Sequence, residues 1–281
     1  MNEALATRGW QAQLDLDYAL RGNRTRLAKK HQLGPLTVQR SFYPEGGICH
    51  NYILHPPGGV VGGDSLQLNV HTRSGAHNLL TTPGATKFYR SDAAQVGRQT
   101  QQFNIADNAI TEWLPQANIF FPGANAVLNT VVDIAPGGKF IGWEMHCLGC
   151  PASNETFTSG SLRSQTRIRV AGELRLVEQL NTCADQIVAS ATGLRGMAMQ
   201  GSLVAAPCSE AQRDAMEQIL QSTPEVNYPY PIGLTLVDEV LVIRALGAQT
   251  EPMLAVFTRL WLELRRQWLA TEPCLPRIWA T

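Results

Sequence analysis

Residues 55–92 read HPPGGVVGGDSLQLNVHTRSGAHNLLTTPGATKFYRSD, and their pattern recurs through the rest of the chain. Two Gly-Gly pairs precede Asp64, and paired glycines adopt backbone angles that other residues avoid and let another segment approach closely. In residues 66–72 apolar and polar side chains alternate, which is typical of a strand with one buried face. Turn residues and another short strand follow. This stretch therefore predicts short strands separated by glycine-rich turns.

The glycine pairs do not form a phosphate-binding motif. A phosphate loop requires G-x-x-x-x-G-K-[ST] at the start of a helix, and a dinucleotide site requires G-x-G-x-x-G after a strand. No lysine follows Gly62-Gly63, and the next segment has the alternation of a strand. Nucleotide binding is therefore not expected at this stretch.

The short-strand pattern extends over most of the chain. Further strands are predicted at residues 10–18, 36–42, 101–105, 109–114, 127–134, 140–145, 167–178 and 233–246. Many short strands at intervals of about 8 to 12 residues predict a mainly β fold, as a sandwich, barrel or solenoid. The basic segment 21–31 is predicted to be a solvated loop between strands, with a docking patch for an acidic partner as the alternative.

Two α-helices are predicted in the C-terminal third. Ser209 and Gln212 form a capping box at the start of the first helix. The second begins near Thr250, with an acidic residue and a proline in its first turn. Its apolar stripe predicts a core-packing face, or alternatively a partner-binding face, formed by Leu254, Phe257, Trp261, Leu264 and Trp268. No composition shift divides the chain, so residues 1–281 are expected to form a single domain.

The charge balance restricts the classes of partner. Lys+Arg and Asp+Glu both total 23, so the net charge is zero. Nucleic acid and anionic membranes select basic surfaces, so neither is expected as the main partner. Six sparse cysteines do not resemble a disulfide framework, residues 1–18 do not resemble a signal peptide, and no apolar run reaches the roughly 18 residues of a membrane span. These features predict a cytoplasmic protein.

The segment His146-Cys147-Leu148-Gly149-Cys150 is a candidate zinc motif. A C-x-x-C offers two thiolates, and His146 could add a third ligand. The second ligand pair of a structural zinc site is absent from the sequence. Buried or idle thiols are therefore expected, and whether Cys147 and Cys150 contact a metal stays open.

The histidines do not match a catalytic zinc motif. None of the six pairs as H-x-H or H-E-x-x-H, and no G-x-S-x-G elbow of a hydrolase is present. One enzymatic alternative stays open, a metal-dependent hydrolase that uses Asp64 with His50, His55 or His77.

Three carboxylates interrupt apolar or glycine-rich surroundings: Asp64, Glu144 and Glu178. A carboxylate is costly to bury unless it is paired or lines a wet cavity. Each is therefore either a capping or ion-paired group, or a weak oxygen ligand on a path for a divalent ion. Carboxylates with water bind first-row metals reversibly, whereas imidazole or thiolate cages hold nickel tightly.

Three blocks of sequence resemble one known family. PPGGVVGGD followed by GAHNLLTTPGATKFYRS is similar to the signature of the urease accessory protein UreD family, called UreH in some organisms. The string EWLPQ at residues 112–116 and the ending PRIWAT at residues 276–281 also resemble that family. The blocks extend from residue 55 to residue 281.

The resemblance implies a β-rich, β-helix-like body with two helices, and a maturation factor for urease that is not an enzyme. It also implies a hetero-oligomer with UreF and the GTPase UreG that docks on apo-urease. Nickel would pass transiently through an internal channel, with no tightly bound cofactor. Asp64 lies in the matching GGD motif, and Glu144 and Glu178 lie near acidic positions of the family in blocks that match less closely. A purely structural scaffold without a metal path is the alternative.

The family pattern differs from this chain at the thiols. Related sequences carry Leu-Gly-Arg where this chain has Leu148-Gly149-Cys150. The C-x-x-C is therefore expected to be local to this protein.

Overall fold

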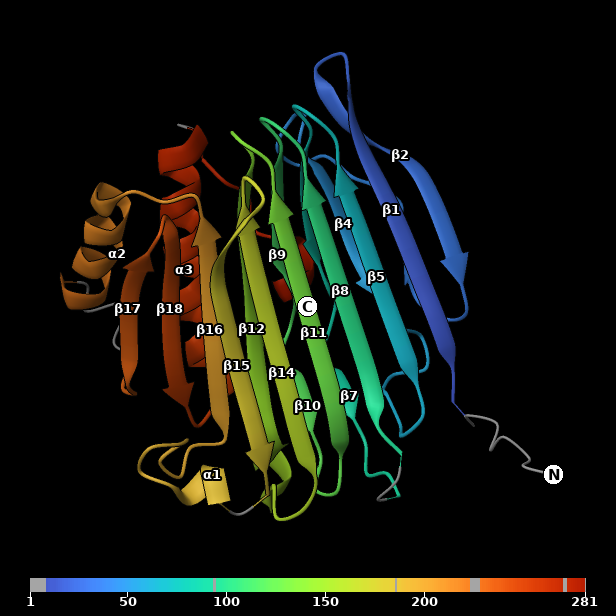
Figure 1. Cartoon of the computed structure of the whole chain (residues 1–281), viewed down its shortest axis with the longest axis vertical. Helices are drawn as coiled ribbons and strands as arrows, with labels where there is room; N and C mark the ends of the chain where they lie inside the picture. Colours follow the sequence, from blue (N-terminus) through green and yellow to red (C-terminus); the bar gives the residue numbers. More distant parts are fainter. Residues whose placement is uncertain (1–8, 93–94, 185, 223–227, 270–271, 281) are drawn as a thin grey trace.

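The computed structural model describes residues 9–92, 95–184, 186–222, 228–269 and 272–280. Two large β-sheets lie face to face, and helices α2 (Glu210–Ser222) and α3 (Thr250–Leu269) cover the outer face of one of them (Figure 1). Residues 1–8, on which the expectation about a signal peptide partly rests, lie outside the described residues.

Each sheet has its own spatial order of strands. The first sheet consists of β15 (Glu173–Cys183), β14 (Ser161–Val170), β11 (Asn125–Ile134), β8 (Gly97–Ile105), β5 (Ser65–Thr72), β1 (Gln11–Arg21) and β2 (Arg24–Leu33). The second consists of β17 (Ile232–Val237), β18 (Val240–Gly247), β16 (Met199–Ala206), β12 (Lys139–Cys150), β9 (Ile110–Leu114), β6 (His77–Thr81), β4 (Cys49–Leu54) and β3 (Thr37–Val38). Shorter elements are β7 (Thr86–Phe88), β10 (Asn118–Phe120), β13 (Glu155–Thr156), α1 (Gln186–Ala189) and the 3-10 turns Pro151–Ser153 and Arg277–Ala280.

Parallel pairing makes the centre of the molecule a β-solenoid. Within the described residues, β4, β6, β9 and β12 pair in parallel in the second sheet. The strands β5, β8, β11 and β14 pair in parallel in the first sheet. Each strand of one set is followed along the chain by a strand of the other set, so the chain winds between the sheets. The prediction of a mainly β, β-helix-like body with two α-helices in the C-terminal third of the chain is confirmed.

Alternation along β12 separates two apolar layers. Phe140 and Leu148 lie in the layer between the sheets, whereas Trp143 and Cys147 lie in the layer between the second sheet and the helices. His146 faces the inter-sheet side, because side chains of a strand alternate with period two. His146 therefore does not join Cys147 as a metal ligand, although the two are adjacent in sequence.

Two predicted segments differ from the structure. The basic segment 21–31, predicted as a loop, is mostly strand β2, which forms a hairpin with β1 at the edge of the first sheet. An edge strand tolerates charged side chains because they remain solvated and block unwanted pairing. The strand predicted at residues 36–42 is reduced to Thr37–Val38 and an isolated bridge between Phe42 and His50. Between them the Gln39 carbonyl accepts a hydrogen bond from the Asn51 side chain (2.8 Å).

The predicted helix signals are present. Ser209 and Gln212 form the capping box, with Ser209 N 2.8 Å from Gln212 Oε1 and Gln212 N 3.4 Å from Ser209 Oγ. In α3 the buried face is rotated from the predicted stripe. Leu254 and Trp268 are only partly buried, while the fully packed residues are Met253, Val256, Phe257, Leu260, Trp261, Leu264 and Arg265. The stripe is a core-packing face, and no helix among the described residues is long and apolar enough to cross a membrane.

Candidate functional site

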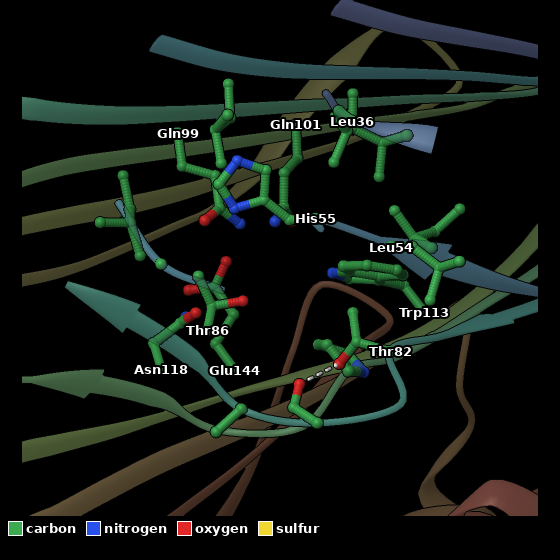
Figure 2. Close-up of a pocket in the computed structure, with 18 of the residues that line it drawn as sticks. Leu36, Leu54, His55, Thr82, Thr86, Gln99, Gln101, Trp113, Asn118 and Glu144 are labelled. Atoms are coloured by element: carbon green, nitrogen blue, oxygen red, sulfur yellow. Dashed lines mark hydrogen bonds between the residues drawn. The ribbon is translucent and has the colours of Figure 1, made fainter. Parts of the chain in front are cut away.

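A cavity of about 230 Å³ lies between the two sheets. Its mouth is formed by exposed residues that include Gly58, Pro83 and Gly84. Leucines from β5 and β11 form part of its wall, and polar side chains gather in its interior (Figure 2). These polar residues are His55, Gln99, Gln101, Asn118, Thr130 and Glu144.

Two further hollows lie next to this cavity. A smaller cavity of about 70 Å³ shares Trp113, Thr130 and Glu144 with the first. A surface groove of about 610 Å³ shares Glu178 and Gln200 with the smaller cavity and reaches the exposed Arg244. The two cavities and the surface groove are therefore neighbours, with Glu144 in the wall shared by the first two and Glu178 in the wall shared by the second and third.

Glu144 is held by hydroxyl groups and a histidine. Its Oε1 accepts a hydrogen bond from Thr130 Oγ1 (2.6 Å), and its Oε2 accepts one from Ser164 Oγ (3.3 Å). His146 Nε2 lies 3.6 Å from Oε2. Burial alone would raise the pKa of Glu144, but His146 and the two hydroxyls lower it below its ordinary value. The inner junction therefore carries an ionised carboxylate.

Glu178 lies on β15 and pairs with Arg244 of β18. Its two oxygens accept hydrogen bonds from Arg244 Nε and Nη2, each at 2.6 Å. The pair joins the first sheet to the second beside the groove, and the Glu178 side chain is 19% exposed. The outer junction therefore combines a carboxylate with a solvated guanidinium.

Asp64 lies apart from both glutamates. Its Oδ1 accepts a hydrogen bond from the Trp10 backbone N–H (2.7 Å) and its Oδ2 accepts one from the Val61 N–H (2.9 Å). Gly9 packs so closely that an added Cβ would lie 2.1 Å from the Gly63 carbonyl. Asp64 is 2% exposed and does not belong to the lining of the three hollows. Its carboxylate caps the glycine-rich loop that leads into β5.

Several buried polar atoms on the larger cavity have no hydrogen-bond partner among the described residues. They are both ring nitrogens of His55, Oε1 of Gln99 and Nε1 of Trp113. Burial lowers the pKa of His55, and the charge of Asp64 opposes this shift in part. A neutral imidazole therefore faces the cavity, ready to accept a hydrogen bond.

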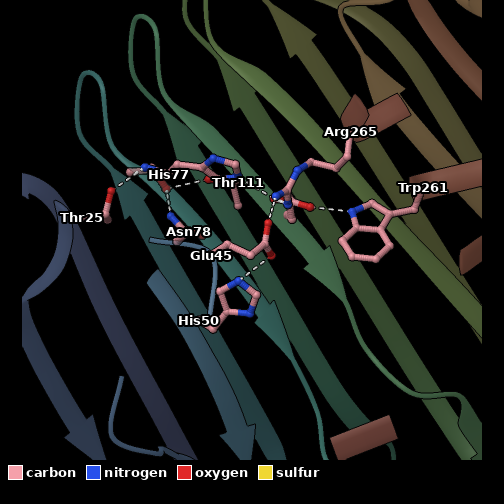
Figure 3. A network of polar contacts seen from close by, with 10 residues as sticks. Thr25, Glu45, His50, His77, Asn78, Thr111, Trp261 and Arg265 are labelled. Atoms are coloured by element: carbon pink, nitrogen blue, oxygen red, sulfur yellow. Dashed lines mark hydrogen bonds and ion pairs between the residues drawn. The ribbon is translucent and has the colours of Figure 1, made fainter. Parts of the chain in front are cut away.

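A second buried network was not predicted from the sequence (Figure 3). Arg265 of α3 donates to Glu112 of β9 and to Glu45, and all three side chains are buried. Glu112 also bonds His77 Nε2 and Trp261 Nε1, each at 2.5 Å. One feature of the sequence could have predicted the place of Arg265 in this network. Arg265 follows Trp261 by four residues, so the two side chains lie on the same face of the helix.

The residues of the hydrolase alternative are divided among different surroundings. His50 lies 3.0 Å from Glu45, and His77 bonds Glu112. His55 lines the cavity, and Asp64 caps its loop. Across the described residues, no group of three or more His, Cys, Asp or Glu side chains is arranged to hold a metal ion. The structure does not assemble the hydrolase site.

The thiols are not gathered with a third metal ligand among the described residues. Cys147 is buried, and burial raises its pKa to about 12, with a smaller effect from Cys150. Cys150 is partly exposed, and its sulfur lies 3.6 Å from Ser153 Oγ. A thiol with so high a pKa is protonated at neutral pH.

Comparison with known proteins places the whole chain in one family. The model of the UreD urease accessory protein family matches residues 11–280. Urease accessory protein UreD of Aliivibrio fischeri strain MJ11 is 47% identical over 279 residues, which cover 97% of each chain. UreD of Escherichia coli is 48% identical over 275 residues, covering 97% of this chain and 98% of the relative. UreD of Vibrio parahaemolyticus is 46% identical over 274 residues. The chain therefore belongs to the UreD family of urease accessory proteins, which are maturation factors and not enzymes.

Proposed function

We propose that this protein acts in the cytoplasm with UreF and UreG, docks with them on apo-urease, and conducts nickel through its interior to the urease active site. Membership of the UreD family supports the role in urease maturation. One observation supports the internal path: two cavities between the sheets and a surface groove share lining residues where they meet.

The chemistry of the two junctions suits a transient ligand. Glu144 and Glu178 each offer carboxylate oxygens at a junction between hollows. A carboxylate with water completing the shell binds a first-row dication weakly enough to release it. At the outer junction the ion would replace Arg244 as the partner of Glu178. They also lower the cost of moving a charged ion through protein. In this proposal Glu144 and Glu178 are successive transient binding positions for nickel.

Asp64 has a different role in the proposal. Its oxygens bond backbone N–H groups, so it acts on the path by holding the loop before β5. Residues 58 and 59 of that loop line the larger cavity. Asp64 therefore shapes the wall near the mouth.

The test replaces the junction carboxylates with neutral isosteres. Glu144→Gln and Glu178→Gln keep the side-chain volume and remove the charge. Nickel per urease active site, normalised to the amount of assembled complex, should fall by about tenfold or more, the range expected when the supporting groups of a metal site are removed. Glu173→Gln is the matched control, because Glu173 is an exposed carboxylate on the same strand as Glu178.

The scaffold alternative makes the opposite prediction. If both junction variants load nickel as well as the Glu173→Gln control, the carboxylates are dispensable and the protein acts only in assembly.

A further inference from the structure

We infer that the larger cavity binds a small neutral organic molecule with an apolar body and a primary carboxamide head. This inference goes beyond the proposed nickel path and does not rest on it, because it depends only on the walls of the cavity. Glu144 lies in that wall, so an occupant of the cavity would also narrow the proposed path.

Most of the wall of the larger cavity is apolar. Its aliphatic side chains are those of Leu36, Ile53, Leu54, Leu66, Leu68 and Leu128. A buried water needs several polar partners, and cavities with apolar walls stay dry. Contact with an apolar body removes such side chains from water, at a gain that grows with the area covered. This part of the wall therefore favours the apolar portion of an organic ligand over water.

The size of the larger cavity suits one ring with a short head. Apolar cavities of about 150 Å³ bind benzene. The larger cavity, at about 230 Å³, has room for such a ring and a few further atoms. It opens to solvent at a mouth formed in part by the exposed residues Gly58, Pro83 and Gly84.

The polar atoms of the cavity include a donor as well as acceptors. Trp113 Nε1 only donates, the Gln99 carbonyl Oε1 only accepts, and a neutral His55 ring does both. All of these atoms are buried without a hydrogen-bond partner among the described residues, and Trp113 is 4% exposed. In Figure 2 the ring nitrogen of Trp113 points into the cavity, towards the side on which His55 and Gln99 lie. An unsatisfied buried group is costly, and a ligand head with both an acceptor and a donor would satisfy these atoms.

These atoms select a carboxamide over heads of the same shape. A carboxamide carries one carbonyl oxygen and two N–H groups, so it can pair with both Trp113 and Gln99. A carboxylate lacks the N–H that Gln99 needs, and the ionised Glu144 repels it. An amidinium lacks the acceptor that Trp113 needs. Glu144 would attract this cation, but its two oxygens already accept hydrogen bonds from Thr130 and Ser164.

Benzamide, benzoate and benzamidine test the inference, because they share one shape and differ in the charge and hydrogen bonding of the head. Each is titrated calorimetrically into the full-length protein without nickel. Benzamide should bind at least about fivefold more tightly than the other two, the effect of one hydrogen bond of about 1 kcal/mol. A crystal structure of the benzamide complex should show the amide beside Trp113 and Gln99.

Two variants test the two hydrogen bonds separately. Trp113→Phe removes the N–H donor and keeps an aromatic ring in the wall. It should weaken benzamide binding about fivefold and leave benzamidine binding unchanged, because only the amide accepts from this donor. Gln99→Leu removes an acceptor, so it should weaken benzamide and leave benzoate unchanged, and it serves where Trp113→Phe does not fold. Trp10→Phe is the control and should bind like the wild type, since Trp10 is 59% exposed and lies outside the cavity lining.

Three results on the wild-type protein would overturn the inference: no binding of benzamide, benzamide located outside the larger cavity, or benzoate or benzamidine bound as tightly as benzamide. Unchanged benzamide affinity in a folded Trp113→Phe or Gln99→Leu variant would overturn it as well. All of these results leave the nickel path intact, because that path is tested by nickel loading in Glu144→Gln and Glu178→Gln. Normal loading by those two variants would instead reject the path and leave the ligand site intact.

Discussion

At the scale of single residues, partners rather than residue type decide what a carboxylate does. Asp64, Glu144 and Glu178 were predicted together as possible oxygen ligands. Asp64 bonds two backbone N–H groups, Glu144 bonds two hydroxyls, and Glu178 pairs with an arginine. Only the two glutamates line the hollows.

The capping role of Asp64 predicts a loss of stability on mutation. Asp64→Ala leaves the N–H groups of Trp10 and Val61 without their acceptors, and an unsatisfied buried group costs about 1–3 kcal/mol. Asp64→Asn should lose only part of this stability. Its amide oxygen can still accept from one of the two N–H groups, whereas its amide N–H₂ faces the other N–H group and cannot accept from it. Urea denaturation measures the change. A wild-type urea midpoint for Asp64→Ala, together with reduced nickel loading, would restore the direct-ligand role.

Glu112 predicts a specific dependence of stability on pH. Burial alone would raise its pKa, but Arg265 and His77 lower it from 4.5 to about 2. The folded protein then binds this proton less readily than the unfolded chain does. The contribution of Glu112 to stability is therefore complete above pH 4.5 and is lost as the pH falls towards about 2.

Acid unfolding of Glu112→Gln tests this dependence. Other carboxylates titrate in both proteins, so the comparison is between two slopes of unfolding free energy against pH. The slope between pH 4.5 and 2 should be shallower in the variant than in the wild type, and equal slopes would contradict the assignment.

At the scale of elements, α3 is attached to the second sheet by both packing and charge. Trp261 and Phe257 pack in the apolar layer, and Arg265 reaches the sheet through Glu112 and the loop before β4 through Glu45. Two buried carboxylates share one guanidinium, so loss of the cation removes the arginine charge that both of them face.

Neighbouring arginines of α3 provide a matched test. Arg265→Met should lower the free energy of unfolding by about 3–5 kcal/mol, because it strands two buried carboxylates. Arg266→Met, at an exposed position of the same helix, should change it by no more than about 0.5 kcal/mol. Replacing Glu45, Glu112 and Arg265 together with apolar residues should recover part of the loss. Equal stabilities for the two single variants would show that the network does not hold α3.

At the scale of the whole molecule, the C-terminal segment closes the helix layer. The Trp279 ring lies 5.6 Å from that of Trp143 and 6.1 Å from that of Trp261, measured between centroids. Its Nε1 donates to Thr81 Oγ1 at 3.0 Å. The end of the chain thereby joins β6, β12 and α3.

Removal of this contact should destabilise the fold. Trp279→Ala should cost roughly 3 kcal/mol, the lower end for truncating a buried tryptophan, because the ring is only partly buried. Trp10→Ala is the control, since its side chain is 59% exposed and its backbone contact with Asp64 survives the change. Thermal unfolding compares the two. If Trp279→Ala melts like the control but binds UreF less well, the ring acts at the UreF interface instead.

Local features were predictable because they depend on short-range chemistry. The alternation before Thr72 encodes β5, and Ser209 with Gln212 encodes the start of α2, since both patterns act within a few residues. The predicted stripe of α3 shares Phe257, Trp261 and Leu264 with the buried face. It missed Arg265, because a charged residue carries no apolar signal. The basic segment became β2 because β1 supplied a partner that local composition does not report.

The sequence by itself determined the strand pattern, the two C-terminal helices and the family, which periodicity, turn residues and three motif blocks encode. Only the tertiary structure decided which side chains meet. Arg265 and Glu112 are 153 positions apart, and Arg244 and Glu178 are 66 apart, while the adjacent His146 and Cys147 face opposite layers. The winding of the solenoid and the packing of α3 select these partners, and sequence separation does not. The shared walls of the neighbouring hollows have the same origin, because their lining comes from strands far apart in the chain.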